Sequence, residues 1–351
     1  MLRLTQRAFP VSLNRVLPVH HVVSRNPPLR SFSLLRNLRK PFEDAKKTVL
    51  SSVQSLNKLK SFQIPRREYR TNEQVPSSDE EWQAIASQVP RLPFGFVRSV
   101  LLPVLFLGTI ALAAIALANS DGVRERRRKR NAQQRIAGNS GYFSDATRSL
   151  MYITGVNTLV FLLWQAPQAR PVMNNYFLHG PLNPNLISGL LCNVSHKTFF
   201  HFMFNMVALT SFSHSLERSM SPEQIVAIYI AGGAMSSLSS HLFKLITRDL
   251  VPSLGASGSV YAMVAASTYL NPDARYTFIF FPMYDFSAST LFPIIVAFDA
   301  IGCFGSAFKL FRFGFDHAAH LGGAAFGWYY TEYLVRKHRQ RQAAINNTYR
   351  R

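Results

Sequence analysis

The chain has 351 residues, of which 48% are hydrophobic, and it carries a formal net charge of +21. The apolar residues are collected into long runs with few charges, a pattern that argues against an ordinary soluble domain, and basic blocks flank those runs. A nucleic-acid-binding domain is one interpretation of so basic a chain. Basic blocks beside apolar runs are typical of membrane proteins, however, so we expect a lipid bilayer and no nucleic acid as partner. Cys192 and Cys303 lie in or beside apolar runs and suggest no disulfide framework.

The composition of the N-terminal segment indicates a targeting sequence. Residues 1–42 contain eight Lys or Arg, and the first acidic residue is Glu43. An Arg-rich, Ser-containing and acid-poor start is the signature of a mitochondrial transit peptide. We therefore expect a transit peptide over 1–42, with a cleavage point that the sequence does not reveal, and a polar N-terminal tail over 43–98. A basic tail without a targeting role is the alternative.

Seven mostly apolar segments follow. A membrane-spanning helix needs about 20 such residues, and the sequence predicts helices at 99–120, 149–169, 198–216, 224–243, 251–270, 287–305 and 316–335. The expected fold class is therefore an all-α polytopic membrane protein. Its expected parts are one additional N-terminal transmembrane helix (99–120), a basic linker (121–148), a six-helix core (149–335) and a basic C-terminal tail (336–351).

Small residues and helix-start signals mark several of these segments. Glycines at 232–233, at Gly258 and at Gly323 with Gly327 (a GxxxG pair) would let helix backbones approach closely, as helices in lipid do. The sequence SPEQ (221–224) predicts a helix start with an N-cap serine, a proline at the first position and a capping glutamine. Residues 170–196 contain three prolines, and we expect a loop there that lies on or dips into the bilayer.

Polar side chains within or beside these segments are the candidates for function, because burying them in a membrane is costly. They are His201, Asn205, His214, Ser257, Asp285, Asp299, Asp316, His317 and His320. Only those that converge on one place can form a site.

Ser257 is the candidate nucleophile. It lies in the sequence LGASG (254–258), just inside the start of a predicted helix. Gly255 and Gly258 leave its hydroxyl unobstructed, and the amides at a helix start can stabilise negative charge. Taken alone the motif is weak, since small residues at a helix contact also produce it. It is not the G-x-S-x-G motif of soluble hydrolases, because Ser259 stands where the last glycine belongs.

His320 is the candidate base that a serine nucleophile requires. It lies in the sequence DHAAHLGG (316–323) with small residues beside it. A structural histidine is one alternative, and a metal site shared with His317 is another. No H-E-x-x-H motif occurs, so we expect no metal and no cofactor.

His201 and Asn205 are the candidate oxyanion donors. Their spacing of four residues places the imidazole and the amide on one helix face. Two donors on a shared face suit a developing oxyanion, and each such donor is worth about 3 kcal/mol where it has been measured. Hydrogen bonding between helices is the alternative for this pair.

These motifs together resemble a known family. G-x-S-G at the head of one helix, H-x-x-x-N two helices earlier and A-H-x-x-G in the last helix are similar to the rhomboid protease pattern, over roughly residues 149–335. The resemblance extends to His196, five residues before His201, and to Tyr261, four after Ser257.

The N-terminal part of the chain also bears on the resemblance. The additional helix at 99–120, the transit-like start and the string DHAAHLGG resemble the mitochondrial presenilin-associated rhomboid-like branch of the family. There is one departure: the Trp-Arg pair that many bacterial rhomboids carry in the loop after their first helix is missing, since 170–196 contains no Trp. The shape of that loop therefore does not follow from the resemblance.

The resemblance implies an intramembrane serine endopeptidase on a six-helix rhomboid core. Ser257 would be the nucleophile and His320 the general base and acid, while His201 and Asn205 would stabilise the oxyanion. It implies supporting roles for five further residues, namely Gly255, Gly258, Tyr261, His196 and Gly323, of which Tyr261 would pack against the catalytic imidazole. It requires no third carboxylate, and we expect Asp299 and Asp316 to be structural or to pair across helices.

The resemblance also implies substrates that are single-pass proteins of the mitochondrial inner membrane. A transit peptide would place the N-terminus in the matrix, and seven spans would then place the C-terminus in the intermembrane space. The basic C-terminal tail favours the reverse orientation, and we give the targeting signal more weight. A transporter or a helix-binding protein without protease activity is the alternative function. The oligomeric state does not follow from the sequence.

Overall fold

A computed structural model of the chain describes residues 94–120, 145–183, 185–278, 281–311 and 314–349, with isolated positions before 94 and between 122 and 129. The expected transit peptide (1–42) lies outside the described residues, and so does most of the tail at 43–98 and of the linker at 121–148.

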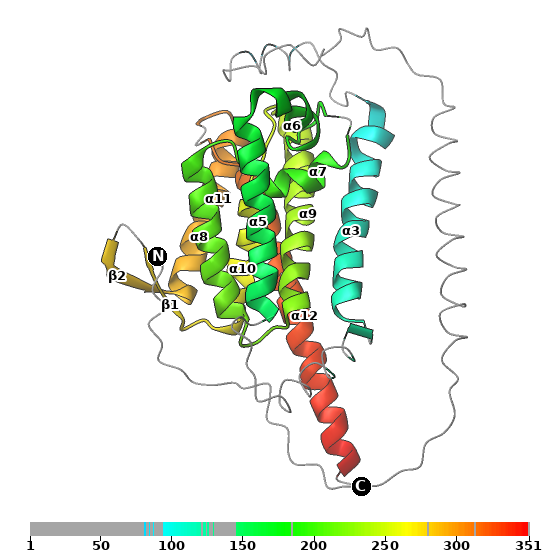
Figure 1. Cartoon of the computed structure of the whole chain (residues 1–351), viewed down its shortest axis with the longest axis vertical. Helices are drawn as coiled ribbons and strands as arrows, with labels where there is room; N and C mark the ends of the chain where they lie inside the picture. The colour runs from blue at the N-terminus through cyan, green and yellow to red at the C-terminus, as the bar shows by residue number, and fades with distance from the viewer. Residues whose placement is uncertain are drawn as a thin grey trace, which may run out of the picture. The chain divides into compact units, whose positions relative to one another are not determined.

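The described part is built mainly of helices (Figure 1). The long ones are α3 (Leu102–Ala118), preceded by the π-helical turn η1 (Val97–Leu101), α5 (Asp145–Gln165), α8 (Phe199–Leu216), α9 (Pro222–Thr247), α10 (Ser257–Leu270), α11 (Ala288–Ala307) and α12 (His317–Tyr349). Short helices fill the proline-containing segment between α5 and α8: η2 (Pro167–Ala169), α6 (Arg170–Tyr176), α7 (Ser188–Leu191) and η3 (Cys192–Val194). A long helix thus overlaps each of the seven predicted segments.

Three helices in the described residues are long and apolar enough, by themselves, to cross a membrane. They are Val97–Ala118, Pro222–Thr247 and Ala288–Ala307. The pair Thr147–Gln165 and Pro167–Tyr176, which bends by 100° at its break, would add a fourth if it formed one span.

The helix starts follow from local sequence. Ser221 caps α9: its hydroxyl accepts from the Gln224 amide, and the Gln224 side chain accepts from the Ser221 amide, which confirms the predicted capping box. Helix α10 begins only at Ser257, later than the predicted start at 251. Pro252 disfavours a helical conformation for the residue before it, and Gly255 has a φ of +135°, which interrupts a right-handed helix.

A β-hairpin precedes α11. Strand β1 (Arg275–Phe278) pairs antiparallel with β2 (Phe281–Ser287), with Thr277 opposite Asp285. Asp285, one of the polar candidates, therefore lies in this exposed hairpin and not in a long helix. Its carboxylate pairs with Arg275 at 2.7 Å, and the hydrogen bond from that guanidinium lowers the pKa of Asp285.

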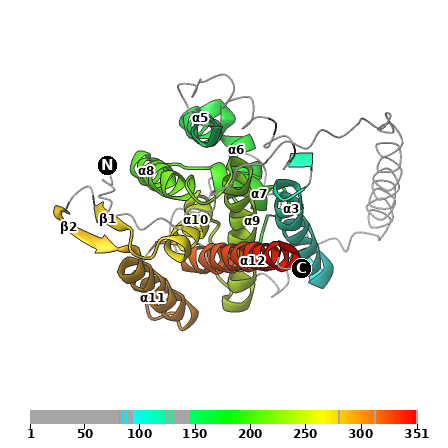
Figure 2. The ribbon, with the colours of Figure 1, turned by 90° about the horizontal axis from the view of Figure 1, so that it is seen from below.

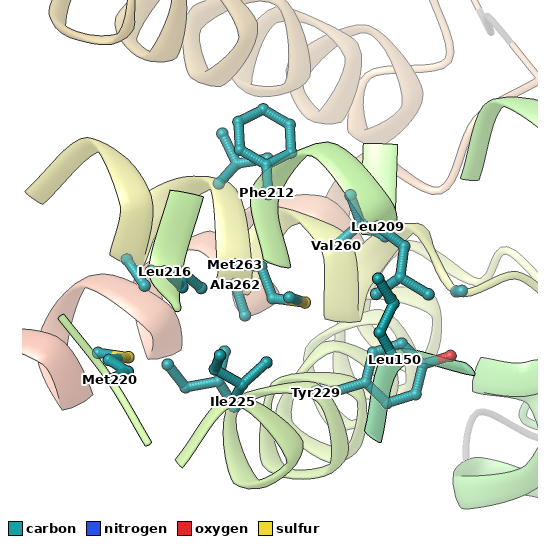
Figure 3. Close-up of a cluster of buried hydrophobic side chains, with 14 of the residues drawn as sticks. Leu150, Leu209, Phe212, Leu216, Met220, Ile225, Tyr229, Val260, Ala262 and Met263 are labelled. Atoms are coloured by element: carbon teal, nitrogen blue, oxygen red, sulfur yellow. The ribbon is translucent and has the colours of Figure 1, made fainter. Parts of the chain in front are cut away.

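Helices α9, α10 and α12 pack against one another at the centre, with α8 against α10 (Figure 2). Small residues make the close packing possible. A Cβ at Gly323 of α12 would lie 2.0 Å from the Gly258 carbonyl oxygen, and one at Gly327 would lie 2.0 Å from that of Ala262. The predicted use of the GxxxG pair as a close helix contact is thereby confirmed. Larger side chains of α5, α8, α9 and α10 form a buried apolar cluster between these helices, which includes Leu150, Leu209, Phe212, Leu216, Ile225, Tyr229 and Met263 (Figure 3).

Helix α3 packs along α9 and is held at three levels. Leu107, in its middle, is 1% exposed and belongs to an apolar cluster with Ala231 and Ala234 of α9. Near one end the carbonyl of Ser99 bonds with His241 Nε2 at 2.8 Å. At the other end the Asn119 amide donates to the Tyr330 hydroxyl of α12 at 2.9 Å.

Candidate active site

Ser257 and His320 lie in hydrogen-bonding contact. The Ser257 Oγ is 2.9 Å from His320 Nε2. The serine is the first residue of α10 and the histidine lies in the first turn of α12. The two helices approach closely at this level because Gly323 has no side chain and leaves room for the backbone of Gly258. Ser257 and His320 are 63 residues apart in the sequence, and a helix contact that only glycine permits brings them together.

Tyr261 fixes the plane of the His320 imidazole. The two rings stack with centroids 4.3 Å apart and an interplanar angle of 11°. Tyr261 is one turn after Ser257 on α10, so the same helix carries the hydroxyl and the ring that supports its partner. This is the contact that the family resemblance implied for Tyr261.

Asp299 completes the contacts of the imidazole, and sequence reasoning missed it. Asp299 lies on α11, is 0% exposed, and its Oδ1 is 2.9 Å from His320 Nδ1 and 2.7 Å from His317 Nδ1. The sequence analysis did not place Asp299 beside His320, although Asp299 does pair across helices as expected. A lone acid in an otherwise apolar segment was the available signal, but it does not reveal its partner.

His201 faces the nucleophile from α8. A methyl group at Gly255 would lie 2.8 Å from His201 Nε2 and 3.7 Å from Ser257 Oγ, so imidazole and hydroxyl border the same small space. His196, which is fully buried, contacts His201 with ring centroids 4.9 Å apart. Its Nε2 accepts from the Ala256 amide at 3.3 Å and so holds the backbone just before Ser257.

Asn205 lies one turn after His201 and is 7% exposed. Its Nδ2 donates to the His201 carbonyl at 2.8 Å, within the same helix. That bond occupies one of the two N–H groups of the amide, and the second N–H is left for another acceptor. The predicted shared face is present, but the contact seen for Asn205 is with its own helix.

Asp316 belongs to a separate buried ion pair. Its Oδ2 lies 3.0 Å from Lys244 Nζ of α9 and 2.5 Å from Ser240 Oγ, and Ser253 Oγ contacts both charged groups. Its Oδ1 accepts from the Ala319 amide at 3.0 Å and caps α12. This matches the expected structural role. His214 is exposed on α8, thirteen residues or about 20 Å along the helix from His201, and its Nδ1 contacts the Thr210 carbonyl.

A metal could in principle use Asp299, His317 and His320, whose potential ligand atoms lie within 4.8 Å of one another. Zinc–nitrogen bonds are about 2.0–2.1 Å long. Here the two Nδ1 atoms contact Asp299 Oδ1 at 2.7 and 2.9 Å, which are hydrogen-bond distances. An ion would have to replace both of these bonds, so the residues do not fit a metal in this arrangement. The expectation of a site without metal stays a prediction.

Comparison with known proteins finds a family model that matches part of the chain. The model of the rhomboid domain matches residues 184–337. The mitochondrial presenilin-associated rhomboid-like protein of Homo sapiens is 39% identical over 202 residues, which are 56% of this chain and 52% of that protein. The mitochondrial rhomboid protein 1 of Saccharomyces cerevisiae is 33% identical over 213 residues, 57% of this chain and 58% of that protein.

The mitochondrial RHOMBOID-like protein 12 of Arabidopsis thaliana is 28% identical over 190 residues, 48% of this chain and 53% of that protein. The chain thus spans about half the length of the relatives it matches. The matched domain contains Ser257, His320, His201 and Asn205. Residues 184–337 of the chain thus match the rhomboid domain, and over the matched residues the chain is similar to the mitochondrial presenilin-associated rhomboid-like branch.

Proposed function

We propose that the chain is an intramembrane serine endopeptidase that cleaves single-pass proteins of the mitochondrial inner membrane. The observation that carries the proposal is the 2.9 Å contact between Ser257 Oγ and His320 Nε2 at the head of α10. A serine becomes a useful nucleophile when a base within hydrogen-bonding distance can take its proton. The match of residues 184–337 to the rhomboid domain supports the same activity.

The proposed reaction is acyl transfer followed by hydrolysis. His320 Nε2 takes the proton of Ser257 as Oγ bonds to the peptide carbonyl carbon, and the carbonyl oxygen becomes an oxyanion. The Ser257 amide, His201 and the second N–H of Asn205 stabilise that charge. The C–N bond then breaks, the proton on His320 passes to the leaving nitrogen, and water attacks the acyl-enzyme with His320 again as base. The reaction requires no metal and no cofactor.

The length of α10 supports chemistry below the membrane surface. Its 14 residues extend for about 21 Å, which is less than the roughly 30 Å of a hydrocarbon core. We propose that the domain has six membrane segments (α5, α8, α9, α10, α11 and α12) with α3 as an additional span. In that 1+6 arrangement the short α10 starts inside the bilayer, and its first residue, Ser257, is recessed.

The proposed location is the mitochondrial inner membrane, with the N-terminus in the matrix and the C-terminus in the intermembrane space. The transit-like composition of 1–42 and the mitochondrial relatives support the compartment. An odd number of spans places the two ends on opposite sides. Protease protection of terminal epitope tags, in intact mitochondria and in mitoplasts, tests both statements.

The decisive test uses the purified full chain in detergent or vesicles with a single-pass model substrate. Wild type should cleave the substrate, and a fluorophosphonate should label it at Ser257, whereas Ser257→Ala should do neither while keeping the melting temperature of the wild type. Cleavage that survives Ser257→Ala would refute the serine mechanism. A wild type that binds substrates but neither cleaves nor reacts would instead indicate a helix-binding protein.

A further inference from the structure

The contact between Asp299 and His320 adds a third residue to the pair of Ser257 and His320. Asp299 is on α11, completely buried, and its Oδ1 lies 2.9 Å from His320 Nδ1, on the side of the ring opposite to Ser257. A carboxylate at membrane depth is costly to bury. The buried position of Asp299 is therefore best explained by the effect of its charge on His320.

The carboxylate determines where the imidazole proton lies. Both histidine Nδ1 atoms within 3 Å of Asp299 Oδ1 must be protonated to donate to it, since an ionised carboxylate can only accept. His320 Nε2 then carries a lone pair and points at Ser257 Oγ. This is the tautomer in which the imidazole can take the serine proton.

The surroundings hold Asp299 in place. His317 donates to the same Oδ1 at 2.7 Å, and its ring lies against α11 so closely that a Cβ at Gly302 would be 2.3 Å from it. Asp299 and Gly302 are three residues apart on one face of α11. His317 therefore fixes the carboxylate from one side while His320 uses it from the other.

We propose that Asp299 is a positioning residue of the reaction, so that Ser257, His320 and Asp299 act as a triad. This inference rests on the proposed function. Asp299 holds the Nδ1 proton and the ring orientation before the reaction. It then stabilises the imidazolium that forms when His320 receives the proton of Ser257, and it takes up no proton itself. His317 has no place in the proton transfer.

A purely structural role, as a polar link between α11 and α12, is the competing explanation, and three variants separate the two. Asp299→Asn replaces the carboxylate by an isosteric amide whose N–H can donate to His320 Nδ1 and so move the imidazole proton to Nε2. Asp299→Glu keeps the charge. Asp316→Asn breaks the Lys244 ion pair, a buried link between α9 and α12, without touching Asp299.

The measurements are kcat and KM for a model substrate, the rate of Ser257 labelling by a fluorophosphonate, and the melting temperature, with rates taken per folded molecule. For Asp299→Asn we expect kcat to fall by about 10²- to 10⁴-fold with little change in KM, and labelling to slow in parallel. Asp299→Glu should recover part of the rate even if it melts no higher than the Asn variant. Asp316→Asn should melt lower but label within about threefold of wild type.

The idea fails if Asp299→Asn, per folded molecule, turns over and labels within about threefold of wild type, or if the Glu variant is no faster than the Asn variant. If the Asn variant does not fold, Asp299→Ser replaces it under the same criteria. Failure of the proposed function looks different, because the wild type itself would then neither cleave nor label at Ser257.

Discussion

The contact between α10 and α12 makes Gly323 a sensitive position, and Gly323→Ala should impair both stability and activity. The added methyl group would lie 2.0 Å from the Gly258 carbonyl oxygen. Real Cβ atoms essentially never come closer than 3.0 Å, so the two helices must separate locally by about 1 Å. Overpacking of this kind costs about 1–3 kcal/mol of stability.

The same displacement acts on the reacting atoms. Ser257 Oγ and His320 Nε2 are 2.9 Å apart and lie on the two helices that would separate. A shift of about 1 Å takes this contact beyond the range of a hydrogen bond, and misplacements of that size cost about 10²-fold in rate. Gly323→Ala should therefore lower kcat by about 10²-fold even at temperatures where the variant is folded.

Gly155→Ala is the matched control. Gly155 lies within α5, and a Cβ there would meet nothing within 4 Å. Alanine is the better helix former by about 1 kcal/mol, so this variant should melt at or above the wild-type temperature and keep its turnover. Both variants are compared by thermal unfolding in detergent, by serine labelling and by substrate cleavage. Equal melting temperatures and equal turnover for the two variants would refute the close approach of α10 and α12.

Three further predictions follow from the site. His320→Ala should abolish cleavage in a folded protein. Chelators should leave wild-type cleavage unchanged. Loss of activity on chelation would indicate a metal at Asp299, His317 and His320. His201→Ala and Asn205→Ala should each lower kcat by about 10²–10³-fold with little change in KM, and parallel losses in both constants would favour a structural role. In model substrates with fixed residues at the cleaved bond, replacing nearby Gly and Pro by Leu or Ala should slow cleavage, because an intact helix keeps the scissile carbonyl hydrogen-bonded. If the cleavage rate does not change across this series, the residues flanking the bond determine substrate selectivity.

The sequence indicated much of the fold because the signals there are local. Uncharged runs, the capping box at Ser221 and the GxxxG glycines each act within a few residues, and each has the predicted structure. The boundaries were less predictable. Helix α10 starts late because of Gly255, and α12 continues to Tyr349 where the sequence suggested only a basic tail, since basic residues and alanines extend a helix once it leaves the apolar run.

The partners of buried charges were beyond local reasoning. Ser257 and His320 were recognised as a pair through their motifs. Asp299 and Lys244 carry no motif, and which group each meets depends on how α11 and α9 pack against α12. Asp285 shows the converse error: an acid next to an apolar segment was assigned to it, although a hairpin with Arg275 keeps it exposed.

The contacts of α3 determine what happens when the chain is cleaved between α3 and α5. The helix is held by the Ser99–His241 contact near one end, by Leu107 in the middle and by the Asn119–Tyr330 bond at the other end. Each of these contacts joins α3, or a residue directly before or after it, to α9 or α12 and is independent of the connection to α5. A single break between α3 and α5 would therefore produce two fragments that stay assembled, and α3 would then behave as a small subunit of a two-chain protein.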